Sequence, residues 1–421
     1  MDKIKTFFYR WQRRGLMFLL ILGPGLTTAI ADNDAGGVAT YSVAAATYGM
    51  ASQFLIIPTT LVLAVSQDVG ARLAVVTRKG LGDLIREQYG VRVAFFIFIL
   101  YFIINQGVVL QNISGLKASY LLLDMPIPWQ ALLVVTCLLL IGFVVRFSYS
   151  RVQRLFFILI FFYVSYVIAA IMVKPDWGAL TLETIYPRRV QMNLTYWFSL
   201  VAVLGTTITA WGQFFLASFI NDKKLSIDHM KYERLEIYVG AILTNGLSFM
   251  IAVAVAQTLF ENDISITGAA DAALALKPLA GEMASVLFAS GLFGASLLGL
   301  TVVPLATAYV FSELFGYEGS LDAGFHKGKL FYVFFGVQIG LALITTLFPT
   351  VNLFALTLYV DFLNGAMLPV IFFFLVRFSE DKNIMGEYAL KGWSSLLLRL
   401  SAILITIAVI VSAAGQFLGL A

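Results

Sequence analysis

Long apolar segments separated by short polar ones run through the whole chain. A transmembrane helix needs about 20 mostly apolar residues to cross roughly 30 Å of hydrocarbon. Eleven segments are long enough, with predicted bounds of 16–46, 51–76, 91–120, 128–147, 152–173, 194–220, 234–260, 283–315, 329–348, 352–376 and 394–418. The pattern therefore predicts an all-α polytopic membrane protein.

The composition agrees with this prediction and excludes several classes of function. Of the 421 residues, 60% are hydrophobic and 12% are charged, whereas a soluble domain has about 25% charged residues. The one cysteine excludes an intramolecular disulfide and a cysteine-based metal site. The two histidines, His229 and His326, lie in polar stretches, which argues against a histidine-based metal site. No nucleophile–base pair or glycine-rich phosphate loop stands out, so we expect neither an enzyme nor a resident cofactor.

The basic residues follow the topology of a membrane protein. If the N-terminus is cytoplasmic, 23 of the 28 Lys and Arg residues fall in cytoplasmic segments, in agreement with the positive-inside rule. Residues 1–15 are then cytoplasmic and the C-terminus lies outside. We expect the lipid bilayer and a transported ion as partners, and no nucleic acid. We further expect a monomer in a prokaryotic inner (plasma) membrane, because the chain is compact and lacks long soluble tails.

The first apolar segment is interrupted by polar residues and glycines. Asp32, Asn33 and Asp34 precede Gly36 and Gly37, and apolar residues continue on both sides. Paired glycines favour a break in a helix, and a break at membrane depth survives only in a protein interior or a wet cavity. Acidic residues at this depth indicate an ion or substrate pathway. The alternative is that the aspartates cap two shorter helices at a water interface.

The sixth segment has a second polar interruption, at positions 206–213. Breaks in the first helix of each half are typical of inverted-repeat transporters, in which the substrate binds where the broken helices meet. The two five-helix repeats would span 16–173 and 194–376, followed by an eleventh helix at 394–418. The alternative is that the threonines only bond back to carbonyl groups of their own helix.

The tenth segment contains Asp361 and Asn364, three residues apart and hence on one face of a helix. An acidic residue this deep in an apolar segment is costly and usually functional. We therefore expect Asp361 to serve the site. The alternative is a structural partner for a hydroxyl or amide group of a neighbouring helix.

Several motifs together resemble a known family. The stretch GPGLTTAIADNDAGGVAT is similar to the first-helix signature of the Nramp divalent-metal transporters, in which G-P-G is followed by D-P-G-N. Further similar stretches follow in order at 67–90, 174–180, 276–297 and 375–388. The resemblance covers nearly the whole chain and implies a LeuT-type fold, with 5+5 inverted-topology repeats plus an eleventh transmembrane helix.

The resemblance also implies a metal site formed by the first, sixth and tenth segments. Asp34 stands at the aspartate of the family motif, but Ala35 and Gly37 replace its proline and asparagine. The family's Met-Pro-His motif aligns with either 209–211 or 210–212, so its thioether and imidazole are absent in both registers. The implied metal site comprises Asp34, Gly37, Thr206, Thr207, Thr209, Ala210 and Asp361, and a surrounding shell comprises Asp32, Asn33, Gln213 and Asn364.

These departures from the family pattern resemble a divergent clade, the Nramp-related magnesium transporters. A thioether favours Mn²⁺, Fe²⁺ and Cd²⁺ over hard cations, so its loss removes discrimination against Mg²⁺. Asn112 and Gly115 also stand where the family has an acidic pair linked to proton movement. We therefore expect uptake of Mg²⁺, and also of Mn²⁺, by alternating access and without proton coupling.

Three other functions remain open at this point. A proton-coupled Mn²⁺ or Fe²⁺ symporter would use Asp32 or Asp361 to carry the proton. A sodium-coupled amino-acid symporter would share the fold, although Asp34 would repel the carboxylate of its substrate. A passive channel is disfavoured, because paired broken helices are typical of carriers.

Overall fold

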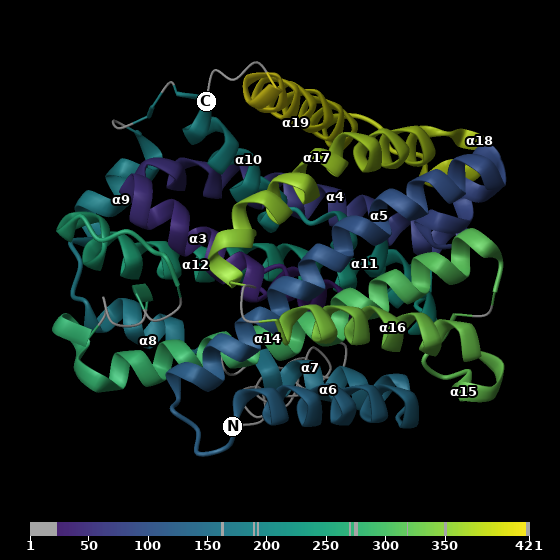
Figure 1. The fold of residues 1–421 in the computed structure, drawn as a ribbon. Coiled ribbons are helices and arrows are strands. Elements are labelled where there is room, and N and C mark those ends of the chain that lie inside the picture. Colours follow the sequence, from purple (N-terminus) through teal and green to yellow (C-terminus); the bar gives the residue numbers. More distant parts are fainter. Residues whose placement is uncertain are drawn as a thin grey trace, which may run out of the picture.

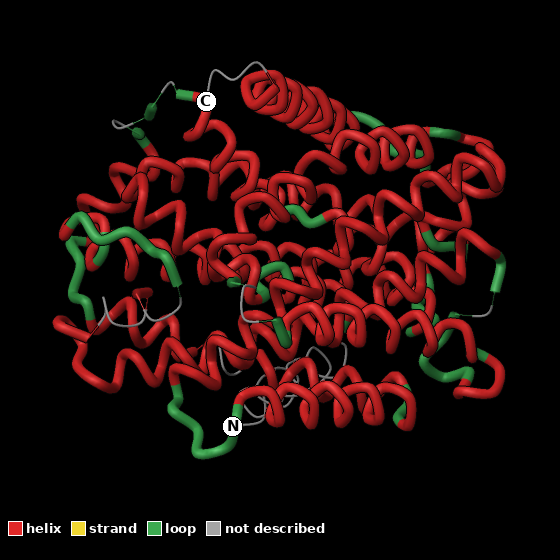
Figure 2. Tube along the Cα trace, in the orientation of Figure 1, coloured by secondary structure: helices red, strands yellow, loops and turns green. Residues whose placement is uncertain are grey.

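A computed structural model describes residues 23–160, 164–187, 190–191, 193–268, 271–272, 277–317, 319–348 and 352–417. Over these residues the chain forms helices and connecting loops and no β-strand, as Figure 2 shows. Nine helical stretches in this part are long and apolar enough to cross a membrane. The predicted all-α membrane class is therefore confirmed.

The helices follow the predicted spans closely. In chain order they are α2 (Pro24–Ala31), α3 (Ala35–Tyr48), α4 (Ile56–Thr77), α5 (Leu81–Leu122), α6 (Trp129–Arg146), α7 (Tyr149–Ile160), α8 (Val164–Met172), α10 (Leu194–Thr207), α11 (Ala210–Asp222), α12 (Met230–Thr258), α14 (Lys277–Phe315), α16 (Lys329–Thr346), α17 (Leu353–Glu380) and α19 (Trp393–Phe417). Shorter helices are η1 (Gly49–Leu55), α9 (Trp177–Ile185), η3 (Ile227–His229), η4 (Phe260–Asn262), α15 (Gly324–Lys327), α18 (Lys382–Met385) and η5 (Gly386–Tyr388). The predicted cytoplasmic segment 1–15 lies outside the described residues, as do residues 16–22 of the first predicted span, 161–163 of the fifth and 418 of the eleventh.

Two long helices are kinked at a glycine near their beginning. Gly90 in α5 has φ 83° and Gly281 in α14 has φ 69°, backbone conformations that glycine adopts without steric cost. The predicted starts of these two spans, residues 91 and 283, lie just after the kinks. The sequence pattern therefore located the membrane-crossing part but missed the preceding turns.

One surface helix was not predicted at all. The stretch 174–180 entered the sequence comparison only as a motif, whereas the structure forms α9 from Trp177 to Ile185. Asp176 caps this helix by accepting hydrogen bonds from the amides of Gly178 and Ala179, at 3.0 and 3.1 Å. An acidic N-cap is a recognisable signal for the start of a helix.

Helices distant in sequence lie side by side in the core. In Figure 1, α5 runs along α14 through the centre of the molecule, α10 lies against α17, and α19 covers α17 on the outside. Glycines permit the closest of these approaches. A Cβ atom at Gly205 of α10 would lie 2.1 Å from the carbonyl oxygen of Asp361 and 2.5 Å from the amide nitrogen of Gly365. The backbones of α10 and α17 therefore touch at the level of Asp361.

We predict that Gly205→Ala destabilises the protein. The added methyl group would overlap backbone atoms of α17, and overpacking of this kind costs roughly 1–3 kcal/mol. Thermal unfolding of the purified protein in detergent should show a lower midpoint than for the wild type. Gly142→Ala is the matched control, because a Cβ atom at Gly142 in α6 meets nothing within 4 Å. Equal midpoints for the two variants would contradict the close contact of α10 with α17.

Candidate metal-binding site

The first helix is broken where the sequence predicted. α2 ends at Ala31, and α3 begins at Ala35 with Asp34 as its N-cap. One carboxylate oxygen of Asp34 accepts a hydrogen bond from the amide of Gly37 at 3.0 Å. Asp34 does cap a helix, as the interface alternative supposed, but its side chain is only 3% exposed. The break therefore lies in the protein interior and not at the protein surface.

The second break faces the first. α10 ends at Thr207 and α11 begins at Ala210, with Thr209 as N-cap. The Thr209 hydroxyl accepts from the amide of Gly212 at 3.0 Å and donates to Oδ1 of Asp32 at 2.6 Å. The two unwound segments are thus joined directly by a side-chain hydrogen bond.

Asp34 is also held by α5. The amide nitrogen of Asn112 donates to Oδ2 of Asp34 at 2.6 Å, and the amide oxygen of Asn112 accepts from the backbone of Ala35 at 3.1 Å. A Cβ atom at Gly299 of α14 would lie 2.1 Å from this amide oxygen. Glycine at position 299 therefore makes room for Asn112, which fixes both the carboxylate and the start of α3.

Asp361 of α17 belongs to the same polar cluster. Its carboxylate accepts hydrogen bonds from the hydroxyl of Thr40 in α3 and, at 3.3 Å, from the amide of Gln111 in α5. Asp34 and Asp361 are therefore both held by α5, through the adjacent amides of Asn112 and Gln111.

Gly37 brings two oxygen atoms close to each other. A Cβ atom at this position would lie 2.8 Å from the carbonyl oxygen of Asp32 and 3.1 Å from Oγ1 of Thr206. A side chain as large as the asparagine of the family motif would displace one of these groups. The carbonyl of Asp32 and the hydroxyl of Thr206 are therefore candidate oxygen ligands beside Asp34.

The side chains of three predicted residues have other partners. The Thr207 hydroxyl hydrogen-bonds to Val203 of its own helix and to the hydroxyl of Tyr41, at 2.6 and 2.5 Å. Asn33 lies between two acidic residues but donates to the carbonyl of Thr244 in α12 at 2.8 Å. Asn364 accepts from the amide of Ala210 at 2.9 Å, which anchors the start of α11. These contacts stabilise the conformation of the two breaks.

Gln213 is the remaining predicted residue. Both polar atoms of its side chain are buried without a hydrogen-bond partner.

Two residues of the cluster were missed by the sequence reasoning. The hydroxyl oxygens of Thr40 and Thr357 lie 2.6 Å apart, and Thr357 donates to the carbonyl of Gly36 at 3.0 Å. Thr357 precedes Asp361 by four residues and so lies on the same face of α17. The four-residue spacing from Asp361 could therefore have identified Thr357 from the sequence.

The N-terminus of α2 is fixed by two buried acidic residues of α12. The amide of Gly25 donates to Glu233 at 3.2 Å, and the amide of Leu26 donates to Glu236 at 3.0 Å. The amide of Gly23 also donates to Glu236. Carboxylates at a helix N-terminus satisfy amides that lack partners within the helix. These bonds orient α2 and hence Asp32 at its other end.

The three aspartates, Asp32, Asp34 and Asp361, have no cationic side chain as a partner in the described part of the chain. In that same part of the chain, no group of three His, Cys, Asp or Glu side chains converges closely enough to hold a metal. The oxygen ligands that this region offers to a cation are the aspartate carboxylates and the neutral hydroxyl, amide and carbonyl groups beside them.

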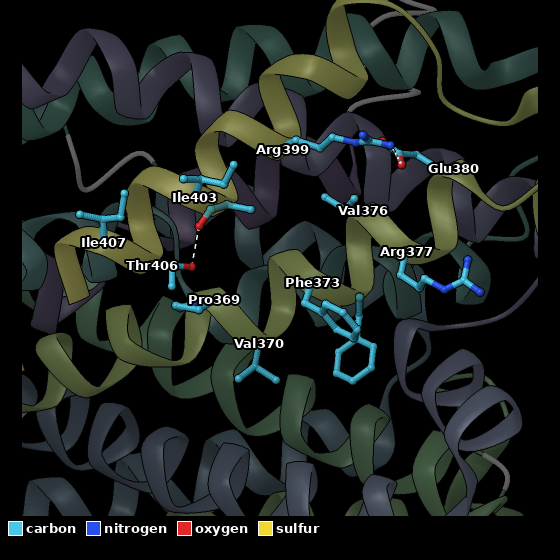
Figure 3. Close-up of a pocket in the computed structure, with 12 residues that line it drawn as sticks. Pro369, Val370, Phe373, Val376, Arg377, Glu380, Arg399, Ile403, Thr406 and Ile407 are labelled. Atoms are coloured by element: carbon cyan, nitrogen blue, oxygen red, sulfur yellow. Dashed lines mark hydrogen bonds and ion pairs between the residues drawn. The ribbon is translucent and has the colours of Figure 1, made fainter. Parts of the chain in front are cut away.

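A groove between α17 and α19 differs from the buried polar cluster because it is apolar and lies on the outside of the protein. Figure 3 shows that Pro369, Val370 and Phe373 of α17 face Ile403 and Ile407 of α19, and that Arg399 pairs with Glu380 at one end, with an Nε–Oε1 distance of 2.8 Å. Phe373, Ile403 and Ile407 are each more than half exposed. The groove is thus an apolar outer surface and contains none of the predicted site residues.

Comparisons with known proteins identify relatives of this chain. A family model described as Nramp, natural resistance-associated macrophage protein-like, matches residues 25–414. The divalent metal cation transporter MntH of Agrobacterium fabrum is 24% identical over 408 residues, which cover 93% of this chain and 86% of that protein. MntH of Nostoc sp. is 22% identical over 397 residues, with coverage of 92% and 89%.

Similar solved structures confirm the fold. A manganese transporter of Eremococcus coleocola superposes with a TM-score of 0.72 at 16% identity, covering 95% of this chain and 88% of that one. MhsT in complex with L-phenylalanine superposes with a TM-score of 0.56 at 15% identity, covering 94% and 98%. The predicted LeuT-type fold is therefore correct. The chain belongs to the Nramp family of divalent-metal transporters and is not an enzyme.

Proposed function

We propose that this protein carries Mg²⁺, and also Mn²⁺, into the cell by alternating access and without obligatory proton coupling. The observation that carries the proposal is the chemistry of the groups around Asp34. They are carboxylate, amide and hydroxyl groups, whereas sulfur and imidazole ligands favour softer metals. Mg²⁺ usually keeps several of its waters and contacts one or two carboxylates. Asp34 as a direct ligand, with Asp361 acting directly or through water, fits this requirement.

The burial of the site supports alternating access. Asp32, Asp34 and Asp361 are each at most 3% exposed, so an ion at this position would be enclosed by protein on all sides. A carrier must pass through such a closed form, and movement of α2 away from α12 would open a path on one side. A channel would instead keep a continuous path.

The absence of coupling is supported by the contacts of α5. The α5 side chains that bond to Asp34 and Asp361 are the amides of Asn112 and Gln111. An amide side chain has donors and an acceptor but does not take up a proton near neutral pH. A proton carrier would have to be one of the aspartates themselves.

We further propose the orientation, the membrane and the repeat organisation given by the charge pattern and the two breaks. The N-terminus, with residues 1–15, is cytoplasmic and the C-terminus lies outside in a prokaryotic inner membrane. Residues 16–173 and 194–376 form the two inverted repeats, and 394–418 form the additional helix. The bacterial origin of the MntH relatives supports the choice of membrane. The functional unit is a monomer.

The runner-up function is a proton-coupled Mn²⁺ or Fe²⁺ symporter. It is favoured by the similarity to a solved manganese transporter and by Asp32 and Asp361, which could each accept a proton. A sodium-coupled amino-acid symporter is less well supported. The fold of MhsT is similar, but a fold alone does not determine a substrate, and Asp34 would repel an anionic one.

The decisive experiment is transport into proteoliposomes that contain a pH-sensitive dye. An inward Mg²⁺ gradient should produce Mg²⁺ uptake without acidification of the lumen, because the α5 groups beside the site cannot relay protons. A proton ionophore added at the end verifies that the dye responds. Acidification that depends on Mg²⁺ would refute the uncoupled mechanism, and Mn²⁺ uptake without Mg²⁺ uptake would favour the runner-up.

We predict that Asp34→Asn abolishes transport of both Mg²⁺ and Mn²⁺. The substitution keeps the size of the side chain but removes the charge of the proposed direct ligand. Uptake at low ion concentration should fall by more than about tenfold, equivalent to about 1.4 kcal/mol of lost interaction. Asp124→Asn, at an exposed turn after α5, is the control and should transport normally. Wild-type rates in Asp34→Asn would exclude Asp34 as a ligand.

We predict that Ala210→Met shifts the preference of the transporter towards Mn²⁺. A thioether introduced at the start of α11 would add a soft ligand, and the Mn²⁺ to Mg²⁺ uptake ratio should rise by about tenfold, or about 1.4 kcal/mol. Thr209→Met tests the other register of the sixth segment. If only Thr209→Met changes the ratio, position 209 and not 210 corresponds to the family methionine.

A further inference from the structure

Only one of the two carboxylate oxygens of Asp32 has a hydrogen-bond partner. Oδ1 accepts the hydrogen bond from Thr209 at 2.6 Å, but Oδ2 is buried and has no hydrogen-bond partner. The residue is 2% exposed. A buried charge without full compensation is strongly unfavourable. The resemblance assigns the motif aspartate to Asp34, so this second acid has no assigned partner.

A second unsatisfied side chain lies on the same side of the breaks. Gln213 is 2% exposed, and neither its amide oxygen nor its amide nitrogen has a hydrogen-bond partner. Gln213 lies one turn into α11, whose N-cap is Thr209. Its backbone amide donates to the carbonyl of Thr209 at 3.4 Å, so the two residues lie on successive turns at the same side of the helix. Thr209 contacts Asp32 from that face. A Cβ atom at the intervening Gly212 would lie 3.1 Å from Oδ1 of Asp32, so the start of α11 packs directly on this carboxylate.

The helix dipoles distinguish Asp32 from Asp34. Asp34 is the N-cap of α3, where the positive end of the helix and the amide of Gly37 compensate its charge. Asp32 follows the C-terminus of α2, where the helix dipole adds further negative potential. The side of the break that carries Asp32 therefore attracts a cation more strongly than its single carboxylate alone would.

We propose that Asp32, Thr209 and Gln213 form a second cation position, which the transported dication occupies after it leaves Asp34. Its ligands would be a carboxylate, a hydroxyl and an amide oxygen, completed by water, as hard dications prefer. α2 and α11 are the halves of the two broken helices that the proposed orientation assigns to the cytoplasmic side. The second position thus lies on the release side, and successive sites of moderate affinity let an ion leave a strong one.

This inference rests on the transport of divalent cations and on the proposed orientation, but not on a preference for Mg²⁺. Equilibrium binding of Mn²⁺ to the purified full chain, followed by electron paramagnetic resonance of the free ion, tests it. Asp34→Asn should retain one Mn²⁺ position, weaker than the wild-type site by at least about tenfold. Asp34→Asn combined with Asp32→Asn should lose it, and the combination with Gln213→Leu should weaken it. The combination with Asp124→Asn is the control and should bind like Asp34→Asn.

The proposal is overturned if the single variant Asp34→Asn and the double variant with Asp32→Asn bind Mn²⁺ equally. The same holds if neither of them binds Mn²⁺. If the wild-type protein neither binds nor transports Mn²⁺ or Mg²⁺, the proposed transport function itself is refuted. The two failures are therefore distinguishable.

A transport measurement separates a binding role of Asp32 from a structural one. Asn at position 32 can still accept the hydrogen bond from Thr209, so the link between the breaks remains. In the Asp32→Asn variant, the KM for Mn²⁺ should stay within about threefold of the wild type, whereas the maximal rate should fall by at least about tenfold. Asp32→Glu should restore part of the rate, because it restores the charge. A maximal rate of Asp32→Asn within about twofold of the wild type would refute the proposal.

Discussion

Negative charge buried between two broken helices is the constraint on which the rest of the structure depends. Asp32, Asp34 and Asp361 lie in a low-dielectric interior and form no ion pair with a described Lys or Arg. Neutral donors such as Thr40, Thr209 and the α5 amides stabilise the carboxylates but do not cancel their charge. In the proposed transport cycle, a cation that enters this region and leaves again would supply the missing compensation transiently.

The neighbouring helices serve to hold this charge in place. α12 caps the N-terminus of α2, α5 bridges Asp34 to the start of α3, and α17 contributes Asp361 from the opposite side. Close backbone contact makes this possible, because Gly205 and Gly299 leave no room for a side chain against α17 and Asn112. Groups from α3, α5 and α17 therefore meet within one polar cluster, although they are far apart in sequence.

The ends of the helix fragments make the electrostatic potential differ from one side of the cluster to the other. Backbone amides at the N-termini of α3 and α11 donate hydrogen bonds to Asp34 and Thr209. By contrast, the negative end of the α2 dipole lies beside Asp32. The potential is therefore not uniform along the path between the fragments. This asymmetry supports an ordered passage of the ion from Asp34 to Asp32 during release.

The sequence by itself determined the helical membrane class and the location of both breaks. Hydrophobic length and paired glycines are local properties, so they can be recognised without knowledge of packing. The partners of each polar group could not be recognised in this way. Asn33 lies between two acids yet turns to α12, and Thr207 adjoins Thr206 yet bonds to Tyr41. Only the tertiary structure decided these contacts, because a side-chain partner depends on which helices pack together and on where a glycine allows them to touch.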